Sequence, residues 1–277
     1  VDLVEDVARD ENLKVDLAGY KDAMGKQRLL SQESWKGSGE AAVPKTFRDL
    51  RSRGLDSHFL GYDTLETESK ILSLVMGDHE VDSIAKGAEA AVILDQTPFY
   101  AESGGQVGDV GQITDGAAHF RVENTFKYGQ GLIVHKGRLE EGSLVAGGTV
   151  NAAVVQGHRM TVAGNHTATH LLHAALREIL GDHVKQAGSR VAADRLRFDF
   201  SHFTQVSAEN LLEVERWVND RIRENLPLNT QIMNKEDAMK TGAMAIFEEK
   251  YGDEVRIIDI GDGLSLELCG GTHARRT

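Results

Sequence analysis

The single cysteine of this chain constrains its fold more than any other feature. Cys269 begins a Cys-Gly-Gly-Thr-His sequence that ends at His273, and it has no second cysteine to pair with. Far upstream, His166 and His170 stand four residues apart. Cysteine sulfur and histidine nitrogen are the donors that zinc takes in tetrahedral protein sites. These four residues therefore predict a metal site that joins two distant segments.

Residues four apart on a helix share one face, so His166 and His170 can both point at one ion. His173 partly shares that face. The residues between the pair are Thr-Ala-Thr, so the general-base glutamate of a His-Glu-x-x-His metalloprotease is absent. Four protein ligands would also make a closed structural site. The pattern alone leaves a catalytic and a structural role open.

The first half of the chain changes from helical to strand-like composition. Residues 2–10 and 15–36 have helical composition, and a cluster of glycine, serine and proline at 37–44 ends the second run. From about residue 57, short β-rich runs alternate with turns, which predicts a small glycine-rich β-barrel or a sandwich. The expected strands are 58–62, 70–75, 90–94, 110–113, 120–126, 132–136 and 149–155.

The pattern changes again at Gly157. A helix is expected at 159–180 with a stop at Gly181, and a second one from its N-cap Ser207 to about 225. The remaining expected elements are strands at 189–191, 196–200 and 229–233, a short helix at 235–241, and a hairpin of 255–260 with 264–268, which places Cys269 directly after a strand.

The predicted fold class is α+β. We expect an N-terminal helical segment at 1–56, the barrel at 57–156, and an α/β domain at 157–277 with an antiparallel sheet and a metal-site helix.

Charge and composition limit the partners. The net charge of −12 over 277 residues argues against a general nucleic-acid binder, because phosphate contacts need lysine and arginine. Residues 157–203 nevertheless hold six Lys/Arg against four acids, so any RNA contact is expected there. No apolar run approaches the ~20 residues that span a bilayer, and no membrane partner is expected. One unpaired cysteine favours the cytoplasm. We interpret the chain, which begins with Val1, as a piece of a longer protein.

Four separated motifs resemble the editing domain of alanyl-tRNA synthetases. They are Thr97–Asp109 with its Gly104-Gly105-Gln106, the segment His166–His170, Gln186-Ala-Gly-Ser189, and Cys269–His273. The resemblance covers essentially the whole chain, and residues 1–36 look like the end of the tRNA-recognition region that precedes editing. The editing module of threonyl-tRNA synthetases is similar in its histidine and cysteine pattern but is not expected to carry the barrel. Freestanding AlaX-type deacylases are similar in barrel and metal domain, but the helical segment stands against them.

The resemblance implies an aminoacyl-tRNA ester hydrolase that removes serine and glycine from the mischarged 3′ end of tRNA(Ala). The remaining domains of a full-length synthetase would be its partners, and no aminoacylation is expected because that core is absent from the chain. The resemblance implies Zn²⁺ as cofactor, held by His166, His170, Cys269 and His273. The ion could activate water, polarise the ester carbonyl or only hold the substrate's amino group.

The same resemblance implies roles for further residues. Thr169 and Gln186 are expected at the catalytic pocket, although a helix threonine can instead bond back to a carbonyl. Substrate or tRNA contacts are expected from Gly104, Gly105, Gln106, Arg190, Arg195, Arg275 and Arg276. Two other readings stay open: a non-catalytic tRNA-binding module with structural zinc, and a metal-free domain whose histidines pack in the core.

Overall fold

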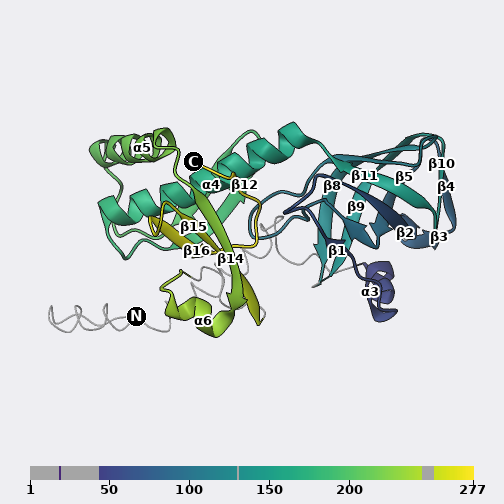
Figure 1. The fold of residues 1–277 in the computed structure, drawn as a ribbon, viewed down its shortest axis with the longest axis horizontal. Helices are drawn as coiled ribbons and strands as arrows, with labels where there is room; N and C mark the ends of the chain where they lie inside the picture. Colours follow the sequence, from purple (N-terminus) through teal and green to yellow (C-terminus); the bar gives the residue numbers. More distant parts are fainter. Residues whose placement is uncertain (1–18, 20–43, 130, 245–252) are drawn as a thin grey trace. The chain divides into compact units, whose positions relative to one another are not determined.

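The computed structural model describes Gly19 and residues 44–129, 131–244 and 253–277. Apart from Gly19, the helices expected at 2–10 and 15–36 therefore lie outside the described residues. Residues Pro44–Thr277 form one compact unit of helices and mostly antiparallel sheets, which confirms the α+β class (Figure 1). The division at residues 56 and 156 stays a prediction.

Six antiparallel strands form a closed barrel. In order around it they are β2 (Glu66–Met76), β5 (Glu89–Leu94), β9 (Leu132–Glu141), β8 (His119–Tyr128), β7 (Gly111–Thr114) and β11 (Thr149–Val154). The pairing of β11 with β2 closes the ring, so the barrel is confirmed and the sandwich is not. Apolar side chains of the strands fill the interior, including Ile71, Ile113, Phe120 and Leu139, none of them more than 1% exposed.

Four short strands around the barrel had no periodicity from which to predict them. They are β3 (His79–Val81), β4 (Ser83–Ala85), β6 (Gln96–Thr97) and β10 (Ser143–Val145), whereas β1 (His58–Phe59) was expected. The strand expected at 58–62 ends at Phe59 because residues 61–63 turn. The helix α3 (Lys45–Ser52) buries Phe47 and Leu50.

The rest of the chain follows the predicted order closely. Helix α4 (Gln156–Leu180) ends at Gly181, which has a φ of 114°. A hairpin of β12 (Gln186–Val191) and β13 (Leu196–Phe200) follows. Helix α5 (Ala208–Arg223) starts at the predicted N-cap, where the Ser207 hydroxyl accepts the Asn210 N–H at 3.1 Å. The sheet order is β14 (Leu228–Asn234), β15 (Glu254–Ile260) and β16 (Ser265–Leu268), with α6 (Lys235–Lys240) after β14.

Helix α4 packs against both this sheet and α5. Leu171 on α4 contacts Ile258 and Ile260 of β15 in one buried cluster.

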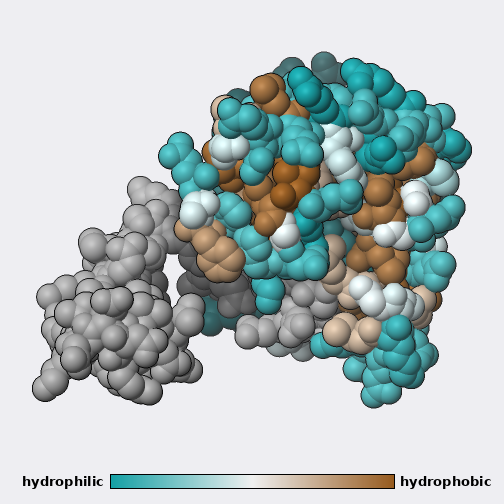
Figure 2. All heavy atoms as spheres, turned by 90° about the vertical axis from the view of Figure 1, so that its left-hand side faces the viewer, coloured by the Kyte–Doolittle hydropathy of each residue, from teal (hydrophilic) through white to brown (hydrophobic). Residues whose placement is uncertain are grey.

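Figure 2 faces the end of the molecule at which Figure 1 draws α5, where apolar surface is visible among polar surface. Leu211 and Leu212 of α5 are both more than half exposed. No helix among the described residues is long and apolar enough to cross a membrane.

Candidate metal centre

Two segments bring four donor side chains together. Helix α4 carries His166 and His170, and the chain leaving β16 carries Cys269 and His273. The four donor atoms all lie within 4.8 Å of one another. Cys269 Sγ is 3.5 Å from His166 Nε2 and 3.4 Å from His273 Nε2. A tetrahedral zinc would hold sulfur and nitrogen about 3.6 Å apart, so the set, hereafter the metal cluster, fits one metal ion.

Each imidazole of the metal cluster has its Nδ1 against an oxygen atom. The contacts are 2.8 Å from His166 to Gln106 Oε1, 2.8 Å from His170 to Glu267 Oε2, and 3.3 Å from His273 to Thr167 Oγ1. The Thr167 hydroxyl already donates to Ala163 O at 3.0 Å, so it accepts from its other neighbours. Because Nδ1 of each ring is directed at an oxygen atom, Nε2 is the nitrogen that is left to bind a metal once the ring is neutral.

Glu267 places a carboxylate at this centre, and it is 1% exposed. It forms a close ion pair with His170 Nδ1 at 2.8 Å and accepts a hydrogen bond from His173 Nδ1 at 2.9 Å. Burial opposes its charge, but His170 and His173 lower the pKa of Glu267 to about 2. Burial likewise opposes protonation of His170, yet Glu267 and the Cys269 thiolate raise its pKa to about 10. The site thus holds a negative carboxylate behind one of the ligands.

Cys269 lies in a setting that favours its thiolate. Burial raises its pKa, but His166 and His273 outweigh that and hold the pKa of the thiol well below its usual value. The Gly271 N–H also donates to the sulfur at 3.4 Å. Burial, followed by the charge of His166, lowers the pKa of His273 to about 3. A metal binds the thiolate and neutral imidazoles, so His170 would give up its extra proton when an ion binds.

Side chains bind the backbone carbonyl groups of the turn that begins at Cys269. Arg256 donates to Cys269 O at 3.1 Å and to Gly271 O at 2.8 Å. The Tyr62 hydroxyl, from the barrel side, donates to Gly270 O at 2.6 Å. The Arg256 guanidinium lies 4.3 Å from the centre of the Tyr62 ring. Three consecutive carbonyls therefore have fixed partners, and the turn is rigid.

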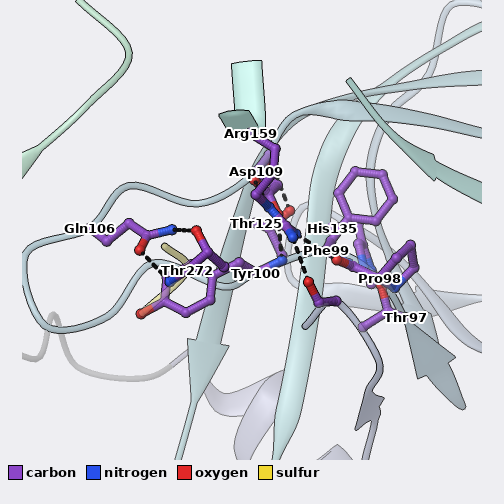
Figure 3. A network of polar contacts seen from close by, with 11 residues as sticks. Thr97, Pro98, Phe99, Tyr100, Gln106, Asp109, Thr125, His135, Arg159 and Thr272 are labelled. Carbon is purple, nitrogen blue, oxygen red and sulfur yellow. Dashed lines mark hydrogen bonds and ion pairs between the residues drawn. The ribbon is translucent and has the colours of Figure 1, made fainter. Parts of the chain in front are cut away.

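Gly271 is required by close packing. A Cβ at this position would lie 2.1 Å from His166 Cε1 and 2.8 Å from Gln106 Oε1. Gln106 itself is fully buried, accepts the Thr272 N–H at 2.9 Å, and donates to Thr272 Oγ1 at 2.8 Å (Figure 3). A barrel residue thus reaches into the metal centre.

A cavity of about 440 Å³ adjoins the metal cluster. The barrel side supplies an aromatic wall that includes Phe59 and Tyr100, and the opposite side supplies Thr169, Gln186 and Ser189. The Thr169 hydroxyl donates to Asn165 O at 2.8 Å and keeps its lone pairs. The Gln186 amide donates to Ser189 Oγ at 3.0 Å and keeps its oxygen. The cavity therefore offers hydrogen-bond acceptors beside the metal cluster.

The other residues expected at the site are spread more widely. Gly104 lines the cavity, whereas Gly105 and Gln106 do not. Gly105 has a φ of 90° and packs against Ser189. Four exposed arginines stand apart from the cavity: Arg190 and Arg195 on the β12–β13 hairpin, and Arg275 and Arg276 near Thr277.

Sequence reasoning missed the residues that surround the ligands. Glu267 stands two residues before Cys269 on a strand and so shares its face, which was a usable signal. Thr167 lies beside His166 in the recognised motif. No sequence pattern pointed to Tyr62 and Arg256, because they come from segments that only the fold brings together.

Comparisons with known proteins agree with the motifs. A family model described as tRNA synthetases class II (A) matches residues 1–157. Proteins named "Alanine--tRNA ligase" match the whole chain: 46% identity with that of Mesorhizobium japonicum, 46% with that of Desulfosudis oleivorans and 48% with that of Paramagnetospirillum magneticum. The chain covers 32%, 31% and 32% of these relatives, so it spans about a third of their length.

Proposed function

Because the chain belongs to the family of class II tRNA synthetases (A), we propose that its metal cluster is the centre of a hydrolytic editing site. The substrate is tRNA(Ala) that carries serine or glycine instead of alanine. The observation that carries the proposal is the metal cluster beside a cavity with hydrogen-bond acceptors. The name of these relatives, alanine–tRNA ligase, supports the choice of tRNA.

We propose zinc as the ion, because three imidazoles and one thiolate form a donor set that zinc takes. A bound zinc ion would supply Lewis-acid chemistry or an activated water. The chain's own residues orient the donors: Gln106, Thr167 and Glu267 each hold one Nδ1. Arg256 and Tyr62 fix the turn that presents Cys269.

Selectivity for serine follows from the acceptors in the cavity. A pocket built for alanine discriminates against one extra hydroxyl or one missing methylene by only about 1–3 kcal/mol, so a second site is useful. The lone pairs of Thr169 Oγ1 and the oxygen of Gln186 can accept from a seryl hydroxyl. Alanine would leave these acceptors unpaired, which costs roughly 1–3 kcal/mol per buried group, and so would glycine, so this feature accounts for the preference for serine alone. The exposed Arg190, Arg195, Arg275 and Arg276 are proposed contacts for tRNA phosphates.

The test is deacylation by the purified chain. We expect hydrolysis of Ser-tRNA(Ala) and Gly-tRNA(Ala), with Ala-tRNA(Ala) spared, and loss of activity in Cys269→Ala. His183→Ala is the matched control, because this histidine does not line the cavity. RNA binding and stoichiometric zinc without turnover would overturn the hydrolase and favour a tRNA-binding module with structural zinc. Undiminished hydrolysis by Cys269→Ala would exclude the metal cluster as the active centre.

A further inference from the structure

We propose that Gln106, a barrel residue, is a positioning residue of the metal centre: it fixes the tautomer of His166 and thereby couples the barrel to metal affinity. The proposal rests on metal binding by the metal cluster and not on hydrolysis. Gln106 is 0% exposed and does not line the cavity. Its side chain is therefore available to the metal centre but not to a substrate.

The backbone of Thr272 determines which way the Gln106 amide points. A backbone N–H can only donate, so the amide atom 2.9 Å from Thr272 N is the oxygen. The amide nitrogen then faces Thr272 Oγ1 at 2.8 Å, and this hydroxyl can accept from it. Figure 3 shows both contacts between Gln106 and Thr272. In the reverse orientation, the Gln106 NH2 group would face the Thr272 backbone N–H, and both groups are donors.

The oriented amide in turn determines the tautomer of His166. Gln106 Oε1 lies 2.8 Å from His166 Nδ1, and an oxygen acceptor at this distance requires a proton on that nitrogen. The lone pair of the neutral ring is then on Nε2. This nitrogen faces the Cys269 sulfur at 3.5 Å, on the side of the other donor atoms. Without the acceptor, the ring could rotate or take the other tautomer, and its metal affinity would fall.

An ion pair holds the end of the loop that carries Gln106. There Asp109 forms a buried pair with Arg159 of α4, with Nε 3.0 Å from both carboxylate oxygens (Figure 3). Asp109 also accepts the Tyr100 N–H at 2.7 Å. The loop therefore ends at a point that is fixed to the metal-site helix.

Backbone hydrogen bonds to β12 hold the same loop immediately beside Gln106. The Val107 N–H donates to Val191 O at 3.0 Å, and the Val191 N–H donates back to Gly105 O at 2.8 Å. The residues on both sides of Gln106 are thus hydrogen-bonded to Val191. These bonds fix the loop backbone and so hold the Gln106 side chain in place beside His166.

The consequence is that the barrel holds α4 at two points, once through Arg159 and once through His166. A change in the barrel loop is therefore expected to reach the metal cluster without touching a ligand. Removing a hydrogen-bond partner of a metal-bound histidine typically weakens metal affinity about 10- to 100-fold. Gln106 is expected to act within this range.

The experiment compares variants that keep or remove the acceptor oxygen. Gln106→Met has nearly the same length but no acceptor, and we expect zinc affinity, measured by chelator competition, to fall about 10- to 100-fold. Gln106→Glu keeps an oxygen for both His166 and Thr272, because the Thr272 hydroxyl can turn to donate, and it should retain wild-type affinity or exceed it. Gln96→Ala is the matched control. Gln96 is a partly buried barrel glutamine bonded to Glu68 O, and its loss should leave zinc affinity unchanged.

Cobalt absorption and the thermal midpoint of the metal-free chain separate positioning from simple loss of fold. We expect Gln106→Met to alter the visible spectrum of the Co²⁺ form, and Gln106→Glu to restore it. Thr272→Val removes the hydroxyl but keeps the Gln106 oxygen, so it should lower the midpoint while zinc affinity stays within a few-fold. Equal zinc affinity in Gln106→Met and wild type would overturn the proposal, as would an equal loss in Thr272→Val. Absence of zinc binding by the wild type would instead refute the metal centre itself.

Discussion

The barrel and the metal centre both bury histidine, but they use its two nitrogens differently. In the barrel, His135 is 0% exposed, and its ring nitrogens contact Thr97 Oγ1 at 2.7 Å and Val92 O at 2.9 Å. Both ring nitrogens of His135 are therefore occupied by contacts within the protein. In the metal centre, His166 and His273 use only Nδ1 for the fold, and Nε2 faces the Cys269 sulfur.

Burial alone therefore does not identify a metal ligand. His135 is more deeply buried than His166, which is 7% exposed, yet it has no nitrogen left for an ion. Burial lowers the pKa of His135 to about 4, as expected for a neutral core histidine. What distinguishes a ligand is a second nitrogen that points toward other donor atoms.

The largest expected effect comes from exchanging the two kinds of histidine for alanine. His170→Ala removes one of four donors, and we expect zinc affinity to fall at least about a thousandfold, since structural zinc binding carries roughly 10–16 kcal/mol. His135→Ala should lower stability but leave one zinc per chain. Elemental analysis and chelator competition check both. Zinc loss in His135→Ala, or zinc retention in His170→Ala, would contradict the comparison.

The second prediction concerns the buried ion pair of Asp109 and Arg159, which links the barrel to helix α4. Arg159 and Asp109 have side chains only 7% and 1% exposed, and Arg159→Met leaves the Asp109 carboxylate buried without its partner. We expect a loss of about 3–5 kcal/mol in the free energy of unfolding, measured by urea denaturation. Arg121→Met is the control. Its ion pair with Glu123 is more than half exposed, so its loss should cost less than about 1 kcal/mol. Similar losses in both variants would refute a special role for the buried pair.

The third prediction concerns acid. The folded pKa of His135 is about 4, below the ordinary value of 6.5, and its neighbours Thr97, Val92 and Phe99 are uncharged. Between these values the unfolded chain binds the extra proton, so the stabilisation is complete above pH 6.5 and is lost as the pH falls through 4. The loss should reach about 3 kcal/mol. Urea denaturation of wild type and His135→Gln from about pH 7 to about pH 4 measures it, and parallel curves would show that His135 does not contribute.

The smallest expected effect is at the weakest of the three Nδ1 contacts. Thr167 Oγ1 is neutral and lies 3.3 Å from His273 Nδ1, so Thr167→Val should weaken zinc binding by no more than about tenfold. Thr161→Val is matched to it, because Thr161 is on the same helix and its hydroxyl donates to Gly157 O at 2.9 Å. Chelator competition should find no change in that control. A hundredfold loss in Thr167→Val would mean that the ranking by contact length is wrong.

Local patterns predicted most of the fold. The strand runs and the Ser207 N-cap are properties of neighbouring residues, and the described structure has them at nearly the expected positions. The four donors of the metal cluster were also predictable, because their chemistry is specific and their spacing on helix and turn is short. The elements missed were the helix α3 and the strands β3, β4, β6 and β10, which are too short to show a clear period.

The surroundings of the ligands could not be predicted in the same way. Gln106 and Thr272 are 166 residues apart, and Tyr62 and Gly270 are 208 apart. No local pattern encodes such pairs, because barrel closure and the packing of α4 bring them together. The family resemblance placed Gln106 among the substrate contacts, whereas the fold buries it behind His166.

Closure of the barrel also affects the order in which the chain can assemble. β11 pairs with β2, where Thr149 faces Lys70, and a single residue, Val155, separates β11 from α4. Such long-range strand pairing is slow, because loop-closure entropy opposes it. Until it forms, α4 has no fixed starting point. We therefore expect metal uptake to be a late event in folding, so that a chain holding its ion is one whose barrel has already closed.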